Sequence, residues 1–151
     1  MNQHFLYVTV DTNVAQTSQY ASFRWKDKVD RDRPVPEMWK FPTASVKAMC
    51  DMFVFGIPCD RIRPFREFKG SALNRKDASN FYKAEYVFNH IIDRASSDES
   101  IAFDIQQLDT ITLIQWDQVF ENIFPKVVAA LPKKTRKPGE ISIVTFYDKL
   151  H

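Results

Sequence analysis

The clearest pattern of hydrophobic and polar positions lies in the middle of the chain, where apolar residues recur with helical spacing. They fall three or four positions apart, so they line one face of a helix over three turns. These residues are Ala84, Val87, Phe88, Ile91, Ile92 and Ala95. Asp77 can cap this helix, and the polar run SSDES at 96–100 ends it.

A second helix is predicted after Pro42, with Thr43 as its N-cap. Its apolar stripe consists of Val46, Met49, Cys50 and Phe53, which occupy positions i, i+3, i+4 and i+7. Gly56 can adopt a left-handed conformation at the end of this helix, and Pro58 prevents its continuation.

A third helical pattern runs from Trp116 to Leu131. Pro125 lies inside it, and a proline in a helix interior costs roughly 3 kcal/mol. We therefore expect a kink or a fresh start at this position.

Four other stretches have the character of strands. Residues 5–10 (FLYVTV) are apolar on both faces, and residues 101–105 alternate apolar with small or polar side chains. Residues 110–114 are rich in β-branched side chains, and EISIVTFYD at 140–148 has the composition of a closing strand. Together with the helices, this order predicts an α+β fold: a single layer of mostly antiparallel sheet packed by two to three helices.

The same periodicities predict which side chains are buried and how the chain is divided. The expected core residues are Phe53, Phe88, Ile91, Phe103 and Phe120. A chain of 151 residues is long enough for one globular domain over 1–151. Within it, the charged and Pro-bounded stretch at about 11–42 is expected to be a long irregular loop.

Composition restricts the location and the chemistry. No apolar run approaches the roughly 20 residues that cross a bilayer, and the first residues lack the pattern of a signal peptide. The two cysteines, Cys50 and Cys59, belong to no metal-ligand motif, and no phosphate-binding fingerprint is present. A cytoplasmic protein without a membrane partner, a metal or another cofactor is therefore expected.

Charge is distributed unevenly although the net charge is only +2. Residues 24–76 hold 13 Lys and Arg against 7 Asp and Glu, an excess of +6, whereas residues 93–121 hold seven acids and only Arg94 as a base. Residues 126–137 add five bases and no acid. Such asymmetry is typical of proteins with one basic and one acidic face.

The preferred function is non-enzymatic binding of a nucleic acid through three segments that are basic or mix basic and aromatic residues, 24–33, 61–69 and 133–137. Guanidinium and ammonium groups bind phosphates, and exposed rings stack on unpaired bases. The candidate residues are Arg24, Trp25, Lys26, Arg61, Arg63, Phe65, Arg66, Lys69, Lys133, Lys134, Arg136 and Lys137.

Two alternatives remain open. The protein could be an inhibitor or adaptor of a protein target, of the kind found in phages or mobile elements, acting through the acidic segment 93–121 or the loop 11–42. More remotely, Glu67-Phe68-Lys69 resembles the E-x-K element of metal-dependent nucleases, with Asp51 or Asp60 as a second carboxylate. The E-x-K resemblance covers only three residues.

Overall fold

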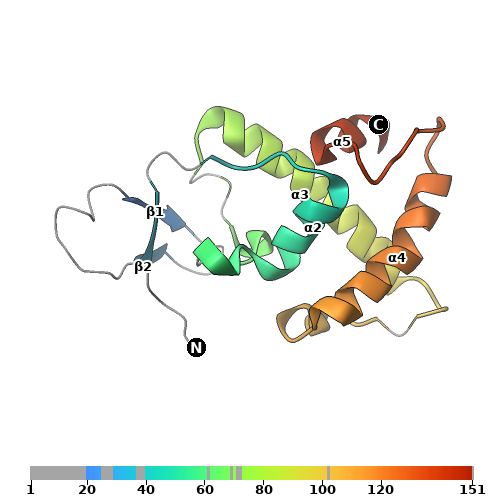
Figure 1. Ribbon diagram of the computed structural model, residues 1–151, viewed down its shortest axis with the longest axis horizontal. Coiled ribbons are helices and arrows are strands. Elements are labelled where there is room, and N and C mark those ends of the chain that lie inside the picture. Colours follow the sequence, from blue (N-terminus) through green and yellow to red (C-terminus); the bar gives the residue numbers. More distant parts are fainter. Residues whose placement is uncertain are drawn as a thin grey trace. The chain divides into compact units, whose positions relative to one another are not determined.

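A computed structural model describes residues 20–24, 29–36, 40–60, 62–68, 70, 73–101 and 103–150. These residues are mostly helical (Figure 1). The α-helices are α2 (Val46–Phe55), α3 (Arg75–Ser96), α4 (Leu113–Ala129) and α5 (Ile143–Leu150). Three short 3-10 helices accompany them: η2 (Pro58–Asp60), η3 (Phe65–Glu67) and η5 (Ile105–Asp109).

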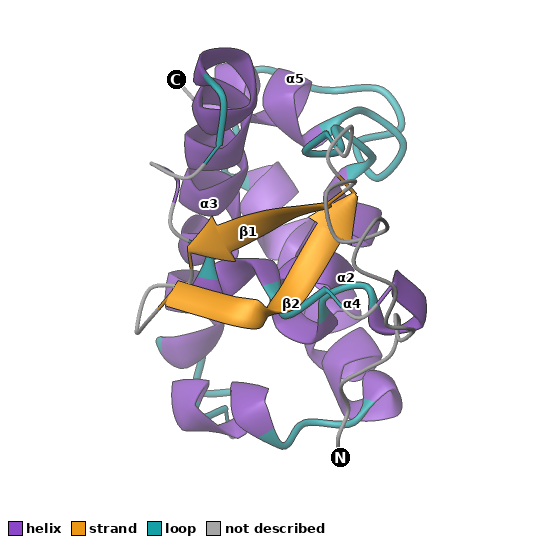
Figure 2. Ribbon diagram, turned by 90° about the vertical axis from the view of Figure 1, so that its left-hand side faces the viewer, coloured by secondary structure: helices purple, strands orange, loops and turns teal. Residues whose placement is uncertain are grey.

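One two-stranded antiparallel ribbon is described, formed by β1 (Tyr20–Arg24) and β2 (Val29–Pro36) (Figure 2). It lies within the stretch 11–42 that the sequence predicts to be an irregular loop. The register runs from Tyr20 opposite Pro36 to Arg24 opposite Val29, with an irregularity between Ser22 and Phe23. Each strand of such a ribbon has an edge without a partner strand, so the prolines of β2 are tolerated there.

The predicted α+β fold with a single sheet is wrong, because segments expected to be strands are helical. Residues 101–105 lead into η5, residues 110–114 form a turn and the start of α4, and α5 replaces the closing strand. The strand expected at 5–10 lies outside the described residues. The physical reason for the helices at 113 and 143 is local capping.

Helix α4 starts with a capping box. The Gln115 backbone N–H donates to Thr112 Oγ1 at 3.2 Å, and the Thr112 N–H donates to Gln115 Oε1 at 2.9 Å. Two donors that a helix start would leave unsatisfied are thereby bonded, which outweighs the β-propensity of the sequence around them. The helix continues through Pro125, so no fresh start occurs there. The carbonyl that lacks a helical donor belongs to Glu121, which is exposed, so water can bond to it.

Helix α5 begins after Ser142, whose Oγ accepts the Thr145 N–H at 3.2 Å. Ile143 and Phe146 are fully buried, and their spacing of three residues fits a helix rather than a strand. The Ile143 N–H also donates to the Ala44 carbonyl at 2.9 Å, and an isolated antiparallel bridge joins Ser45 to Ser142. These bonds hold the start of α5 against the start of α2.

Helix α2 has the predicted apolar stripe, and Val46, Met49, Cys50 and Phe53 are all fully buried. Its cap differs from the prediction, because the Ala48 N–H bonds to Ser45 Oγ rather than to Thr43. Gly56 ends the helix with a φ of 73°, as expected. A Cβ at Gly56 would lie 2.2 Å from the Ile62 carbonyl oxygen, so glycine is required there for space as well as for conformation.

The chain divides into two compact units. Unit 1 comprises Met1–Pro42 and Asp51–Tyr82, and unit 2 comprises Thr43–Cys50 and Lys83–His151. Two of the three boundaries, after Cys50 and after Tyr82, fall inside helices, because α2 and α3 each contribute residues to both units. The third boundary, after Pro42, precedes α2. The single-domain organisation stays a prediction.

A cluster of phenylalanine rings forms the core of unit 1. Ring centroids lie 4.8 to 6.2 Å apart among Phe41, Phe53, Phe65, Phe68 and Phe81. The Phe41 N–H donates to Asp77 Oδ2 at 3.0 Å, and the Asp77 N–H in turn donates to Asn74 Oδ1 at 2.8 Å. Asn74 therefore caps α3, while Asp77 attaches the segment that carries Phe41.

A second aromatic cluster forms the core of unit 2. It contains Phe88, Trp116, Phe120, Phe124 and Phe146, with successive centroids 4.9 to 6.3 Å apart. Of the five predicted core residues, Phe53, Phe88, Ile91 and Phe120 are confirmed as buried. Phe103 is only partly buried.

Replacing Phe65 by alanine should lower the free energy of unfolding by about 3–5 kcal/mol, because the fully buried ring leaves a cavity among other phenylalanines. Urea denaturation followed by circular dichroism measures this. The control is Leu113→Ala at a side chain that is 56% exposed, which should cost less than about 0.5 kcal/mol. Equal effects of the two substitutions would contradict the enclosed position of Phe65.

Candidate nucleic-acid interface

Residues 62–68, the described part of the predicted basic segment 61–69, do not form the extended chain that the alternating cations suggest. Ile62 pairs with Ile57 in an antiparallel bridge, and residues 65–67 form η3. Ile62, Phe65 and Phe68 lie three positions apart, which is the repeat of a 3-10 helix. All three are buried. Phe65 is fully enclosed, so its proposed role in stacking on bases is wrong.

The cations of this segment are only partly available. Arg63 forms an ion pair with Glu67 and its side chain is 18% exposed. Arg66 is half-buried. Arg61 and Lys69 lie outside the described residues, as do Trp25 and Lys26, and only the backbone of Arg24 is described, within β1.

The E-x-K element gains no support from the geometry. Glu67, which would bind the metal ion, is bonded to the guanidinium of Arg63. Among the described side chains there is no group of three or more His, Cys, Asp or Glu residues placed to hold a metal ion.

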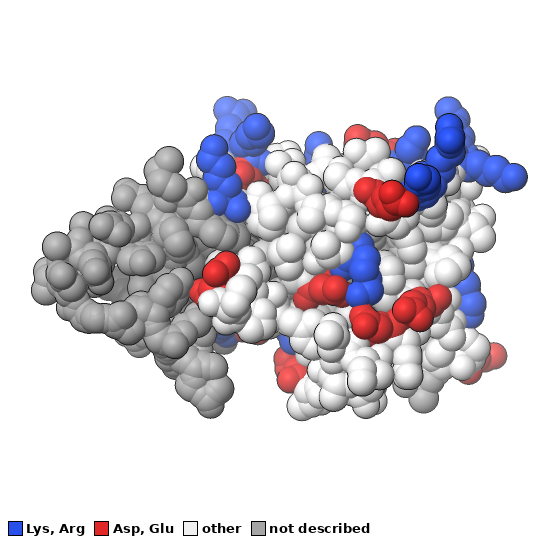
Figure 3. Space-filling view, viewed as in Figure 1, with Lys and Arg blue, Asp and Glu red and all other residues white. Residues whose placement is uncertain are grey.

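The third predicted segment, 133–137, forms an exposed basic loop between α4 and α5. Lys133, Lys134, Arg136 and Lys137 are all exposed, and none of them forms an ion pair with a carboxylate that the structure describes. Figure 3 shows Lys and Arg side chains gathered over this loop. We call residues 133–137 the basic loop.

The backbone of the basic loop is constrained at both ends. The Leu131 N–H donates to the Val128 carbonyl at 3.0 Å, and the Glu140 N–H donates to the Lys137 carbonyl at 2.9 Å. Lys137 has a φ of 46°, a left-handed conformation that non-glycine residues seldom adopt. Residues in such conformations occur often at binding sites.

Aromatic side chains lie on α3 and α5 in the same unit as the basic loop. Tyr86 is 47% exposed, and its ring contacts Tyr147 edge-on at a centroid distance of 5.4 Å. His90 stacks against Tyr86 at 6.4 Å, and the Lys83 ammonium lies 5.9 Å from the Tyr147 ring centroid. The result is a cluster of cationic and aromatic groups in which Tyr86 and His90 are exposed to solvent.

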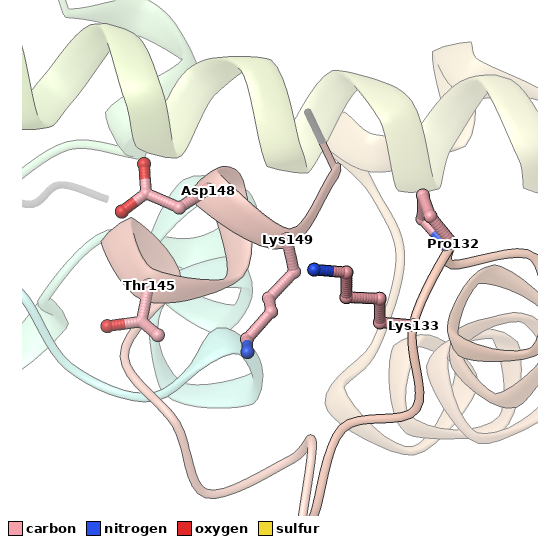
Figure 4. A pocket seen from close by; sticks show the side chains of 5 residues that line it. All are labelled: Pro132, Lys133, Thr145, Asp148 and Lys149. Atoms are coloured by element: carbon pink, nitrogen blue, oxygen red, sulfur yellow. The ribbon is translucent and has the colours of Figure 1, made fainter.

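Helix α5 contributes one residue to this cluster and another to the surroundings of the basic loop, and the two lie on different sides of the helix because they are two positions apart. Tyr147 belongs to the cluster, while Lys149, two residues later, lines a pocket together with Lys133 of the loop (Figure 4). We call the whole set the basic–aromatic surface. It comprises Lys83, Tyr86, His90, the basic loop, Tyr147 and Lys149.

Few acids oppose this surface. Four carboxylates lie on the same segments, 83–93 and 133–149: Glu85 and Asp93 on α3, Glu140 after the basic loop and Asp148 on α5. The surface itself carries six Lys and Arg side chains: Lys83, the four cations of the basic loop and Lys149. These cations outnumber the four carboxylates on the same segments by two.

Elsewhere in unit 2, cations and acids neutralise each other. Lys47 of α2 bonds to Asp117 of α4 at 2.7 Å. Asp98 is nearly buried and accepts bonds from Lys126 at 2.6 Å and Arg94 at 3.1 Å. The Ser100 N–H adds a bond to Asp98 at 2.8 Å. Lys126 first, and then Ser100, hold the pKa of Asp98 well below its ordinary value.

Reasoning from the sequence missed Lys83, Tyr86, His90, Tyr147 and Lys149 as site residues. A signal existed for those on α3, because positions 83, 86 and 90 lie off the apolar stripe that predicts this helix. No comparable signal existed for α5, because the sequence predicts a strand there.

Comparison with protein-family models, curated proteins and solved structures gives no significant match to this chain. Within the described ranges, no helix combines the length and the apolar character that are needed to span a membrane.

Replacing Asp98 by asparagine should destabilise the protein at neutral pH, because the substitution removes the carboxylate that binds Lys126 and Arg94. The folded pKa of Asp98 lies below its unfolded value of about 4, so its contribution is present above that pH. It decreases as the pH falls below about 4 toward the folded pKa. Chemical denaturation of both proteins at several pH values measures the difference.

The matched control is Glu99→Gln, which removes one exposed carboxylate beside Asp98. It should leave the denaturation midpoint nearly unchanged at neutral pH. A constant difference between wild type and Asp98→Asn from neutral pH down to pH values well below 4 would contradict the lowered pKa.

Proposed function

We propose that the protein binds single-stranded nucleic acid through the basic–aromatic surface and has no catalytic role. The proposal rests on one observation: unit 2 contains both exposed cations without carboxylate partners and exposed aromatic rings. Within the described residues, the exposed basic loop and Lys149 contrast with Lys47, Arg63, Arg94 and Lys126, which are all engaged in ion pairs.

The chemistry of the surface fits a single strand better than a duplex. Lysine and arginine side chains follow a phosphate backbone, and planar rings stack on bases that are not paired. Tyr86 and His90 offer such rings, and Lys83 provides a cation next to Tyr147. No described helix presents a continuous row of cations that would suit the major groove of a duplex.

A cytoplasmic location is part of this proposal. It is supported by Cys59, a solvent-exposed thiol, because exposed thiols persist in reducing compartments.

A protein partner is the second candidate function, in the role of inhibitor or adaptor. Two large apolar side chains at the start of α4 favour it, since Leu113 is 56% exposed and Ile114 is 70% exposed. They lie in the acidic segment 93–121, although Asp98 and Asp117 of that segment are already paired with cations. If the wild type binds no oligonucleotide, this function becomes the preferred one.

Replacing both Lys134 and Arg136 by glutamine should weaken binding to an oligothymidylate without changing the fold. Removing one phosphate–cation interaction should reduce the slope of log affinity against log salt by about 0.7, so the double variant should show a slope reduced by about 1.4. Fluorescence anisotropy titrations over a series of salt concentrations measure both the affinity and the slope.

The matched control replaces Arg75 and Lys76, two exposed cations in the first turn of α3, by glutamine. This variant has the same net charge as the loop variant. Equal reductions of affinity in the two variants would mean that binding responds only to net charge, and the assignment of the basic loop would fail.

Tyr86→Ala should also weaken binding to the oligothymidylate, by about 1–3 kcal/mol if one base stacks on the ring. Tyr86→Phe should bind like the wild type, because it keeps the aromatic face and removes only the hydroxyl. The same titrations at fixed salt measure both variants. If Tyr86→Ala retains full affinity, bases do not stack at this position.

A further inference from the structure

The pocket between the basic loop and α5 combines residues that favour an anionic ligand. Pro132 and Lys133 line it from the loop side, and Thr145, Asp148 and Lys149 line it from α5. Its volume is about 420 Å³, within the range of roughly 300–1,000 Å³ that is typical of small-ligand pockets. It is large enough for a nucleotide, not only for an isolated phosphate.

The residues that line this pocket carry a net charge of +1, from Lys133 and Lys149 against Asp148. Neither Lys133 nor Lys149 forms an ion pair with any carboxylate in the described part of the chain. Figure 4 shows the Lys133 side chain reaching from the loop toward α5 and ending beside the side chain of Lys149. The carboxylate of Asp148 points away from both ammonium groups in the same view. Because both lysines line the same pocket, an anion bound there would be attracted by two ammonium groups.

Both lysines are attached to anchored backbone. Lys133 follows the turn in which the Leu131 N–H bonds to Val128 at the end of α4. Lys149 belongs to α5, whose start is fixed by the Ser142 cap and by the bond from Ile143 to Ala44. Little backbone ordering is therefore needed when a ligand binds, which lowers the cost of binding.

We propose that this pocket binds a phosphomonoester group, either at the phosphorylated end of a nucleic-acid strand or on a free mononucleotide. The inference rests on the proposed function, because the basic–aromatic surface would hold the strand that continues from the pocket. A phosphomonoester carries a charge of about −1.5 to −2 at neutral pH, so two ammonium groups attract it more strongly than a singly charged phosphodiester, even with Asp148 in the lining. A phosphodiester within a strand carries one charge, and its chain must continue on both sides of the phosphate.

The test compares two oligothymidylates of the same length that carry a fluorophore at the 3′ end and either a phosphate or a hydroxyl at the 5′ end. Wild-type protein should bind the phosphorylated strand about tenfold more tightly, since charge-assisted hydrogen bonds to the terminal phosphate are added. Lys133→Gln and Lys149→Gln should each abolish most of this preference. Lys134→Gln, an exposed neighbour that does not line the pocket, should weaken both strands equally and keep the preference. Competition with thymidine 5′-monophosphate and with thymidine tests the free mononucleotide.

The outcomes separate this inference from the proposed function. If both strands bind equally and the substitutions at 133, 134 and 149 weaken them alike, the pocket assignment fails while the proposed function stands. If thymidine 5′-monophosphate binds in a manner that depends on Lys133 and Lys149 but no strand binds, the pocket assignment stands and the proposed function fails. If neither the strands nor the mononucleotide binds, both are overturned.

Discussion

The structure depends on the apolar stripe of α3, which supplies core residues to both compact units. Phe81 enters the phenylalanine cluster of unit 1, and Phe88 enters the cluster of unit 2, seven residues and about two helical turns later. Burial of large aromatic side chains is the dominant favourable contribution in each cluster. Since one side of α3 is used in this way, its other side is left to carry polar and aromatic side chains such as Tyr86 and His90.

Ion pairing then determines which charged residues remain available for a ligand. Asp98 engages Lys126 and Arg94, and Asp117 engages Lys47, so these two of the seven acids of the acidic segment balance cations of their own unit. The uneven charge along the sequence therefore does not give one acidic and one basic face of equal strength. What remains is a positive region at the basic loop and α5, where the described carboxylates are few.

Helices with a long apolar periodicity can be predicted from the sequence. Helices whose start depends on capping bonds are missed. Helices α2 and α3 follow directly from their stripes, and so do most of the predicted core residues. Helices α4 and α5 begin among β-branched residues, and only the bonds made by Thr112 and Ser142 show that the chain turns helical there. Tyr147 and Lys149 of the candidate site were missed for the same reason, because they lie on a helix where the sequence predicts a strand. The basic loop can be located from the sequence alone, since a run of cations without acids needs no knowledge of the fold.

The type of aromatic residue separates the core from the candidate site. Within the described side chains, the cluster of unit 1 consists of phenylalanine alone and the cluster of unit 2 of phenylalanine and one tryptophan. The tyrosines that are about half exposed are Tyr82 and Tyr86. A phenolic hydroxyl can bond to water while the face of the ring stays available, so tyrosine tolerates exposure better than phenylalanine does. Phe65 and Tyr86 show the consequence: both lie near cations in the sequence, but only the tyrosine is exposed. An aromatic residue next to basic residues is therefore a candidate for stacking on bases only when its position lies off the buried stripe of its element.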